Sequence, residues 1–281
     1  MTVAVAIFAH QEERRIARCL ASLPLDRRDI EFHVLVNGST DGTVINARRA
    51  AGNRENVQVH DILEGGKSRT WNRFVHQILS GPKQAVIFMD GDAELTSGSI
   101  DALTSSLAKH PNANAAAGLP RNGRMADAYR RAMKAEGGLF GDLYALSGSF
   151  LDRIRERSLK LPNDLIGDDG LIAAWAHTDL DRDDRWKHDR VIPCEDAGFL
   201  CEVVSLFRPS TLHMQHKRLI NYSVRYFQNR IISDIMKREG PVGLPPLLSS
   251  LYAEWLPRFM PRPRLNGWYD KQALARMRRQ A

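Results

Sequence analysis

Two aspartates, Asp90 and Asp92, flank Gly91 directly after the apolar run Val-Ile-Phe-Met. Two carboxylates at the end of a buried strand are costly unless a cation offsets their charge. Hard oxygen ligands suit Mg²⁺ or Mn²⁺, which commonly bridge phosphate groups to a protein, and a glycine lets the backbone turn tightly between them. The pattern predicts a metal site that holds a diphosphate; the alternative is a solvated Asp-Gly turn.

A second acidic pair, Asp168 and Asp169, lies between two glycines where a helix is expected to begin. One of these carboxylates could act as a general base toward an acceptor hydroxyl. The alternative is that both only add favourable negative charge at a helix N-terminus. His213 and His216 are candidate metal ligands, although a single histidine is more often an ordinary surface or core residue.

Three further groups of polar residues could bind a nucleotide. Asn37 follows a predicted strand, and its amide can donate to and accept from a base. Lys67 follows two glycines at a helix start, where phosphate is favoured, although the spacing is not that of a Walker A loop. Gln215 and Arg218 open a long helix, and basic residues there could face a diphosphate or form a solvated face.

Alternating strands and helices must position these residues. Apolar runs predict buried strands at 3–8, 32–36, 57–62 and 85–89, and helical spacing predicts helices at 11–23, 43–51 and 67–79. Such alternation implies a parallel sheet covered on both faces. Ligands bind at the carboxyl ends of the strands in these sheets, which is where the polar groups fall.

The second half of the chain is less regular. Strands are expected at 113–119, 143–151 and 199–207, helices at 100–107, 125–136, 168–175 and 219–237, and a charged surface loop at 178–196. The proline-rich segment 241–263 cannot form one continuous helix. Residues 247–259 nevertheless carry amphipathic spacing, which predicts docking on the core or on a second copy in a homodimer, or peripheral membrane contact through 241–281.

The composition bounds the class of protein. The chain has 281 residues and a net charge of +7, which favours anionic partners without choosing among them. Three cysteines without metal-type spacing suggest a reducing compartment. Neither a signal peptide nor an apolar stretch of about 18 residues is recognised, so we expect a cytoplasmic protein, with a peripheral position at the inner face of the membrane as the alternative.

The motifs in this order resemble the inverting family-2 glycosyltransferases. The match rests on residues 3–13 (VAVAIFAHQEE), 36–43 (VNGSTDGT), Gly66-Lys67 with Asn72, 89–92 (MDGD), 167–170 (GDDG) and Gln215-x-x-Arg218. The resemblance implies an α/β GT-A fold: a Rossmann-like, mostly parallel sheet flanked by helices, an irregular acceptor-side half and a C-terminal helical tail. It places a nucleotide-sugar-binding half at 1–110, an acceptor and catalytic half at 111–240, and the tail at 241–281.

The resemblance also implies residue roles on the donor side. Ala9 and Glu12 match a motif that contacts the nucleotide, Asn37 stands at the base-reading position, and Lys67 matches a residue near the base and phosphates. Asp90-Gly91-Asp92 matches the D-x-D motif, with Asp92 favoured over Asp90 as direct ligand of Mn²⁺ or Mg²⁺. His213 is a further metal-ligand candidate from its residue type and not from the resemblance.

On the acceptor side, the resemblance makes Asp169 the catalytic base and Asp168 the preceding acid. Gln215 and Arg218 match the Q-x-x-R-W motif of processive synthases, but Leu219 stands in place of the tryptophan. The expected reaction is transfer of a sugar from a nucleotide-sugar, with UDP favoured as nucleotide, to an acceptor hydroxyl. The acceptor (a glycan, a lipid-linked group or a small molecule) is not predicted.

Three alternatives remain from the sequence. A nucleotidyltransferase that makes nucleotide-sugars would carry a glycine-rich, arginine-containing loop after the first strand, where this chain has Ala9-His10-Gln11-Glu12. A basic nucleic-acid-binding protein would show aromatic residues clustered among its lysines and arginines, and no such clustering is found. An inactive transferase would bind UDP and metal without transferring sugar.

Overall fold

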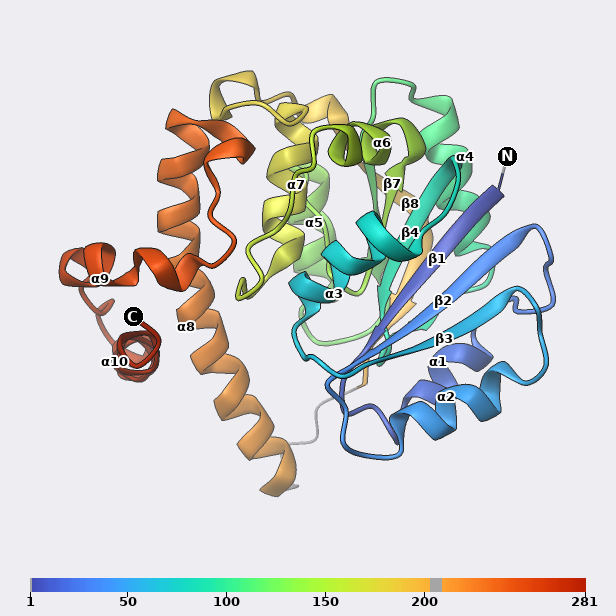
Figure 1. Cartoon of the computed structure of the whole chain (residues 1–281), viewed down its shortest axis with the longest axis horizontal. Coiled ribbons are helices and arrows are strands. Elements are labelled where there is room, and N and C mark those ends of the chain that lie inside the picture. The colour runs from blue at the N-terminus through green and yellow to red at the C-terminus, as the bar shows by residue number, and fades with distance from the viewer. Residues whose placement is uncertain (1, 203–208) are drawn as a thin grey trace.

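An eight-stranded sheet forms the centre of the computed structural model, which describes residues 2–202 and 209–281, the side chains of 209–214 and 265 excepted (Figure 1). The strands are β1 (Thr2–Ala9), β2 (Ile30–Asn37), β3 (Val57–Ile62), β4 (Lys83–Asp90), β5 (Glu94–Leu95), β6 (Ala115–Pro120), β7 (Leu143–Ser147) and β8 (Val191–Leu200). Their order is β3-β2-β1-β4-β7-β6-β8-β5. The run from β3 to β4 is parallel, as predicted.

Helices cover both faces of the sheet (Figure 1). They are α1 (Ile16–Ala21), α2 (Thr43–Ala51), α3 (Lys67–Arg73), α4 (Ser99–Lys109), α5 (Ala126–Glu136), α6 (Gly148–Glu156), α7 (Asp168–Thr178), α8 (Pro209–Arg238), α9 (Tyr252–Trp255) and α10 (Leu265–Arg278). Side chains of β1 alternate between two cores: Val5 and Ile7 pack in one, and Ala6 and Phe8 in the other. Burial of both faces explains why these strands read as continuous apolar runs.

The sheet reverses direction at β7, which runs antiparallel to β4. In this register Met89 lies opposite Leu143, so the start of β7 meets the carboxyl end of β4. The rings of Phe88 and Tyr144 stack across the pair with centroids 5.0 Å apart. The reversal therefore brings the residues before β7 to the strand ends where the ligand site was predicted.

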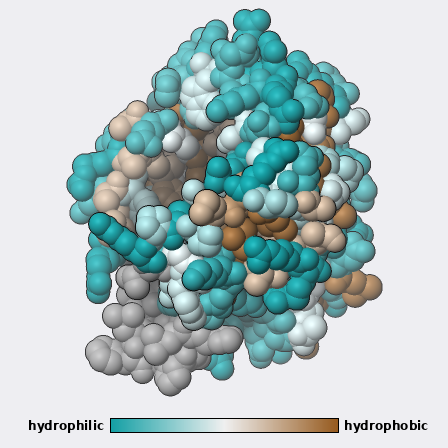
Figure 2. Space-filling model, turned by 90° about the vertical axis from the view of Figure 1, so that its left-hand side faces the viewer, coloured by the Kyte–Doolittle hydropathy of each residue, from teal (hydrophilic) through white to brown (hydrophobic). Residues whose placement is uncertain are grey.

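The C-terminal segment packs on α8. Leu248, Tyr252, Leu256 and Phe259 are all buried, and Phe259 stacks on Phe227 of α8 at 5.0 Å. The segment is broken into short 3₁₀ and α turns, as its prolines predict. Its apolar positions are thus used in docking on the core, and the outer face that carries the C-terminal helices shows only separate apolar areas among hydrophilic residues (Figure 2).

Several predicted boundaries were wrong. The strand expected at 143–151 ends at Ser147, whose hydroxyl accepts from Phe150 N–H at 3.3 Å and so caps α6. The surface loop expected at 178–196 ends in β8, which begins at Val191 because residues 191–199 pair with β6. Residues 203–207 of the strand expected at 199–207 lie outside the described part of the chain.

Three helix boundaries also differ. The helix expected at 11–23 is only Ile16–Ala21, and the one expected at 67–79 changes to a π-helical turn at Phe74–Ile78. The long helix begins at Pro209, ten residues before the prediction. Within the described residues, no helix combines the length and the apolar character needed to cross a membrane. The predicted α/β class with a mostly parallel sheet and a helical C-terminal region is confirmed.

Candidate active site

Three carboxylates meet at the carboxyl end of β4. Asp90 ends β4, Asp92 follows it by two residues, and Asp142 directly precedes β7. One oxygen of each lies within 4.8 Å of the others. Gly91 makes this arrangement sterically feasible: its N–H donates to the Phe8 carbonyl at 2.7 Å, and a Cβ there would lie 2.9 Å from that of Ala9.

Lys67 places an ammonium group against this carboxylate cluster. Its Nζ lies 2.5 Å from Asp90 Oδ1 and 4.0 Å from Asp168 Oδ1, and it donates to the Gly141 carbonyl at 3.3 Å. Lys67 is the first residue of α3, so the helix start aims the side chain at the strand ends. The predicted phosphate-binding lysine and the predicted metal-binding pair therefore share one site.

The cluster holds more negative charge than Lys67 offsets. Burial raises the pKa of Asp90 and of Asp142, and neighbouring carboxylates raise both further against the opposing effect of Lys67. Burial disfavours the Lys67 ammonium, but Asp168 and Asp90 outweigh that effect and raise its pKa. A site with these pKa directions gains free energy from an added cation.

An ion-pair network borders the cluster on the side of β1. Arg15 contacts Glu12 at 2.5 Å, Glu202 at 3.3 Å and Asp92 at 3.5 Å. Burial and the charge of Asp92 raise the pKa of Glu12 to about 7 despite the contact with Arg15. Arg15 thus connects Glu12, which is predicted to contact a nucleotide, to the Asp92 carboxylate.

The second acidic pair opens α7 beside the cluster. Asp168 is buried and faces Lys67, and its Oδ2 has no hydrogen-bond partner among the described residues. Asp169 turns to α8, where Arg225 Nη2 donates to its Oδ2 at 3.1 Å. Burial, together with the charge of Asp169, raises the pKa of Asp168 against the effect of Lys67. The two aspartates therefore occupy different environments.

Asn37 is brought to the site's border but is 3% exposed. Its Nδ2 donates to the Ala9 carbonyl at 3.1 Å, and its Oδ1 accepts from Gly66 N–H at 3.1 Å. The side chain joins the ends of β1 and β2 to the start of α3. In this conformation its amide is already hydrogen-bonded within the chain, and so is the carbonyl of Ala9.

The remaining predicted residues lie on the first turns of α8. Gln215 and Arg218 are partly exposed, and none of the described contacts joins either of them to the carboxylates. The side chain of His213 lies outside the described part of the structure. His216 packs beside Trp268 of α10 at a ring distance of 5.2 Å, so it contributes to helix packing.

The sequence of residues 4–168 matches the family model described as "Glycosyl transferase family 2". This match covers more than half of the chain. The chain belongs to glycosyl transferase family 2. No curated protein sequence matches it.

Solved structures similar to this family member are themselves glycosyltransferases. The mannosyltransferase PcManGT from Pyrobaculum calidifontis, in complex with GDP-Man and Mn²⁺, is 21% identical at a TM-score of 0.62, over 97% of this chain and 73% of that one. Glucosyl-3-phosphoglycerate synthase from Mycobacterium tuberculosis, in complex with Mn²⁺, UDP-Glc and phosphoglyceric acid, is 22% identical at a TM-score of 0.52, over 80% and 79%. At these identities the similarity shows the GT-A fold.

The donor set of this family 2 member fits a divalent cation. Three carboxylates in mutual proximity offer the hard oxygen ligands that Mn²⁺ and Mg²⁺ prefer. Burial, and to a smaller extent the neighbouring carboxylates, raise the pKa values of Asp90 and Asp142, so a bound cation would favour their ionised forms. The site can therefore hold the metal predicted from Asp90 and Asp92, with Asp142 as a further ligand.

Sequence reasoning missed three residues of this site. Asp142 could be found only by knowing that β7 runs antiparallel to β4, which the strand pattern does not reveal. Cys201 directly follows β8, and its thiol donates at 3.4 Å to Asp142 Oδ1, which lies 59 residues earlier in the sequence. Arg225 lies about two helical turns beyond the Gln215–Arg218 motif, and its only sequence signal is a positive charge on the long helix.

Proposed function

We propose that this family 2 member transfers a sugar from a nucleotide-sugar to an acceptor hydroxyl with inversion at the anomeric carbon. The observation that carries the proposal is the convergence of Asp90, Asp92, Asp142 and Lys67 on one side of the site and Asp169 on the other. The first group suits a diphosphate and its metal ion. The second offers a carboxylate to a hydroxyl group.

The residues have separate roles in this proposal. Asp90, Asp92 and Asp142 hold Mn²⁺ or Mg²⁺, which when bound neutralises charge on the leaving diphosphate. Lys67 adds a positive charge for the same phosphates. Asp169 accepts the proton of the acceptor hydroxyl as that oxygen bonds to the anomeric carbon and the bond to the diphosphate breaks. Arg225 holds the Asp169 carboxylate in place through their ion pair.

The donor is proposed to be a UDP-sugar, with a GDP-sugar as the second candidate. The synthase of Mycobacterium tuberculosis is bound to UDP-Glc, and the Pyrobaculum calidifontis enzyme to GDP-Man. Glu12, which Arg15 connects to Asp92, and the buried Asn37, at the end of β2, lie on the side where we expect the nucleotide. Gln215, Arg218 and His213 stay predictions for diphosphate and metal contacts from α8.

A thermal-shift panel of UDP- and GDP-sugars with Mn²⁺, Mg²⁺ or EDTA tests donor binding. A ligand that binds the native state raises the unfolding midpoint, so a metal-dependent shift identifies the donor. With that donor, the nucleoside diphosphate released as the sugar passes to water or to an added acceptor is measured for the wild type and for Asp169→Asn. We expect the variant to bind donor normally and to release diphosphate about 10²- to 10⁴-fold more slowly.

The matched control is Asp189→Asn, which removes an exposed carboxylate just before β8, at the opposite end of the sheet. This control should keep both donor binding and turnover. Near-wild-type turnover of Asp169→Asn would show that another group takes the proton. No metal-dependent shift with any nucleotide-sugar would refute the proposed function itself.

A further inference from the structure

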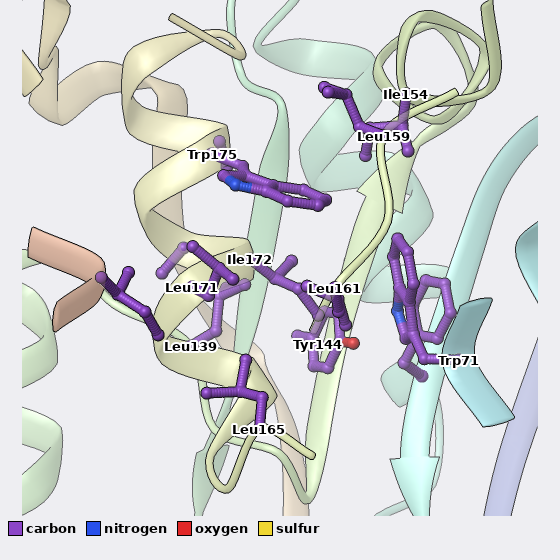
Figure 3. Close-up of a cluster of buried hydrophobic side chains, with 14 of the residues drawn as sticks. Trp71, Leu139, Tyr144, Ile154, Leu159, Leu161, Leu165, Leu171, Ile172 and Trp175 are labelled. Carbon is purple, nitrogen blue, oxygen red and sulfur yellow. The ribbon is translucent and has the colours of Figure 1, made fainter. Parts of the chain in front are cut away.

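The loop at residues 161–167, which leads into α7 and its two aspartates, is held from two sides. Figure 3 shows Leu161 and Leu165 of this loop within the apolar cluster that also contains Trp71 of α3 and Trp175 of α7. The two tryptophan rings lie 6.4 Å apart in an edge-on arrangement. Apolar packing therefore fixes the inner side of the loop, and its polar backbone groups must find partners elsewhere.

Helix α3 supplies the first set of partners. Asn72 donates to the Leu161 carbonyl at 2.8 Å and accepts from Leu161 N–H at 2.9 Å, and it also donates to Asn163 Oδ1 at 3.1 Å. Ser68 donates to the Leu165 carbonyl at 3.1 Å. Both residues lie on the helix whose first residue, Lys67, reaches the carboxylate cluster.

Helix α8 supplies the second set through Gln228, which is 1% exposed. Its Oε1 accepts from Ile166 N–H at 2.8 Å, and its Nε2 donates to the Asp164 carbonyl at 2.9 Å and to Tyr252 Oη at 2.8 Å. The buried Gln228 amide therefore joins the loop to the C-terminal segment, and its bond to Tyr252 is itself buried. Loss of a buried amide would leave Ile166 N–H and the Asp164 carbonyl without their partners.

The C-terminal segment supplies the third set. The Asp164 carboxylate accepts from Leu248 N–H at 2.7 Å and from Ser249 N–H at 2.8 Å, at the start of a 3₁₀ turn. Asn163 N–H donates to the Pro246 carbonyl at 2.8 Å. A segment about 80 residues away in sequence thus fixes the backbone four residues before Asp168.

The end of the loop is fitted to Arg225. A Cβ at Gly167 would lie 2.4 Å from Arg225 Nε, and Gly167 has a φ of +88°, a conformation that favours glycine. The arginine therefore lies against the last residue of the loop while its guanidinium holds Asp169. A shift of the loop would displace this contact and the two aspartates together.

We propose that Gln228 is a positioning residue for the Asp168–Asp169 pair and that the C-terminal segment, through Asp164 and Tyr252, is part of the machinery that sets the reacting geometry. The proposal rests on the proposed function. Gln228 lies beyond residues 4–168, which the family model matches, and it does not contact the carboxylate cluster. Its effect on transfer passes through the loop.

The test compares Gln228→Leu with the wild-type chain. This change keeps the volume of the side chain and removes all three hydrogen bonds. We expect kcat to fall about 10- to 100-fold because small misplacements of a catalytic group have effects of that size. The dissociation constant for the donor should stay within about twofold, since Lys67 and the metal-binding carboxylates are unchanged.

Asn114→Leu is the matched control. Asn114 is also a buried amide, 5% exposed, and it holds the other end of α7 through the Ala176 carbonyl at 2.8 Å and Asp179 Oδ1 at 3.1 Å. The Asn114→Leu variant should lose about as much stability as Gln228→Leu, yet it should keep the wild-type kcat at temperatures where it is folded. Tyr252→Phe, which removes one hydroxyl, gives a milder test should Gln228→Leu fail to fold.

Hydrogen exchange provides a readout that does not depend on turnover. In the full chain, amides of residues 161–170 should exchange faster in Gln228→Leu and in Tyr252→Phe, and not in Asn114→Leu. Unchanged exchange of residues 161–170 in Gln228→Leu would overturn the proposal, and so would an unchanged kcat of that variant. The proposal would also fail if Gln228→Leu and Asn114→Leu lost donor affinity and kcat in parallel. If the wild type transferred no sugar from any donor, the proposed function would fail, and the exchange measurement would still decide whether Gln228 holds the loop.

Discussion

Asp142→Asn should stabilise the metal-free protein while weakening its response to metal. The three cluster carboxylates each have an oxygen within 4.8 Å of the others. At 4.8 Å and an effective dielectric constant of about 20, two fully ionised groups repel by about 3.5 kcal/mol. The Lys67 ammonium, 2.5 Å from Asp90 Oδ1, and the remaining exposure of the carboxylates to solvent offset part of this repulsion. We therefore expect a gain of about 1–2 kcal/mol at pH 8.

The same change removes a ligand from the metal site. A loss of about 10- to 100-fold in affinity for Mn²⁺ corresponds to about 1.4–2.7 kcal/mol of lost metal-dependent stabilisation. In a chain of this size, 1 kcal/mol shifts the unfolding midpoint by about 2–4 °C. The variant should thus melt a few degrees above the wild type in EDTA, and saturating Mn²⁺ should cancel or reverse that difference.

Differential scanning fluorimetry at pH 8 over a Mn²⁺ titration measures both effects in one series. Asp189→Asn, which removes a carboxylate far from the cluster, should follow the wild type in both conditions. A variant that melts below the wild type in EDTA would show that Asp142 is stabilising in the metal-free state. An undiminished Mn²⁺ shift would show that it is not a ligand. Either result refutes the reasoning.

Two further predictions concern the charges around the cluster. Lys67→Met removes the cation that contacts Asp90 and should lower the free energy of unfolding in EDTA by about 3 kcal/mol. Added Mn²⁺ should recover part of this loss. A variant as stable as the wild type in EDTA would contradict the prediction. The raised pKa of Glu12, about 7 against 4.5 in the unfolded chain, means that the folded state holds this proton longer. The stability of the wild type relative to Glu12→Gln should therefore fall by about 2 kcal/mol as the pH rises from 4.5 to 7. Denaturant unfolding of both proteins across this pH range measures the difference, and a constant difference would contradict the prediction.

The first half of the fold could be predicted because it follows a regular rule. The strands containing Val5, Val34 and Ile87 are parallel and buried on both faces, so apolar runs and helical spacing locate them within a few residues. The same rule gathers Lys67 and Asp90 at the carboxyl edge. Both predictions depend only on local patterns and on the direction that a parallel sheet imposes.

The second half could not be predicted as well because its elements depend on strand pairing between segments that are distant in the sequence. β8 contains charged residues and a proline, and it is a strand because β6 lies beside it. Residues 143–151 were expected to form one strand, yet the Ser147 hydroxyl caps a helix in the middle of this segment. Asp142 lies at the site because β7 pairs antiparallel to β4, and Arg225 because α8 packs beside the start of α7. Local sequence spacing encodes neither arrangement.

The two-sided attachment of the 161–167 loop has a consequence for how the chain can vary. The loop is hydrogen-bonded to α3 on one side and to α8 and residues 246–252 on the other. Because these bonds hold its backbone along the whole segment, the number of residues in the loop is constrained. Insertions or deletions there would break several buried hydrogen bonds at once. We expect relatives that keep Gln228 and Asp164 to keep this loop at constant length. Evolutionary changes of length should instead accumulate in the exposed turns near 181–189, where few backbone groups are committed to distant partners.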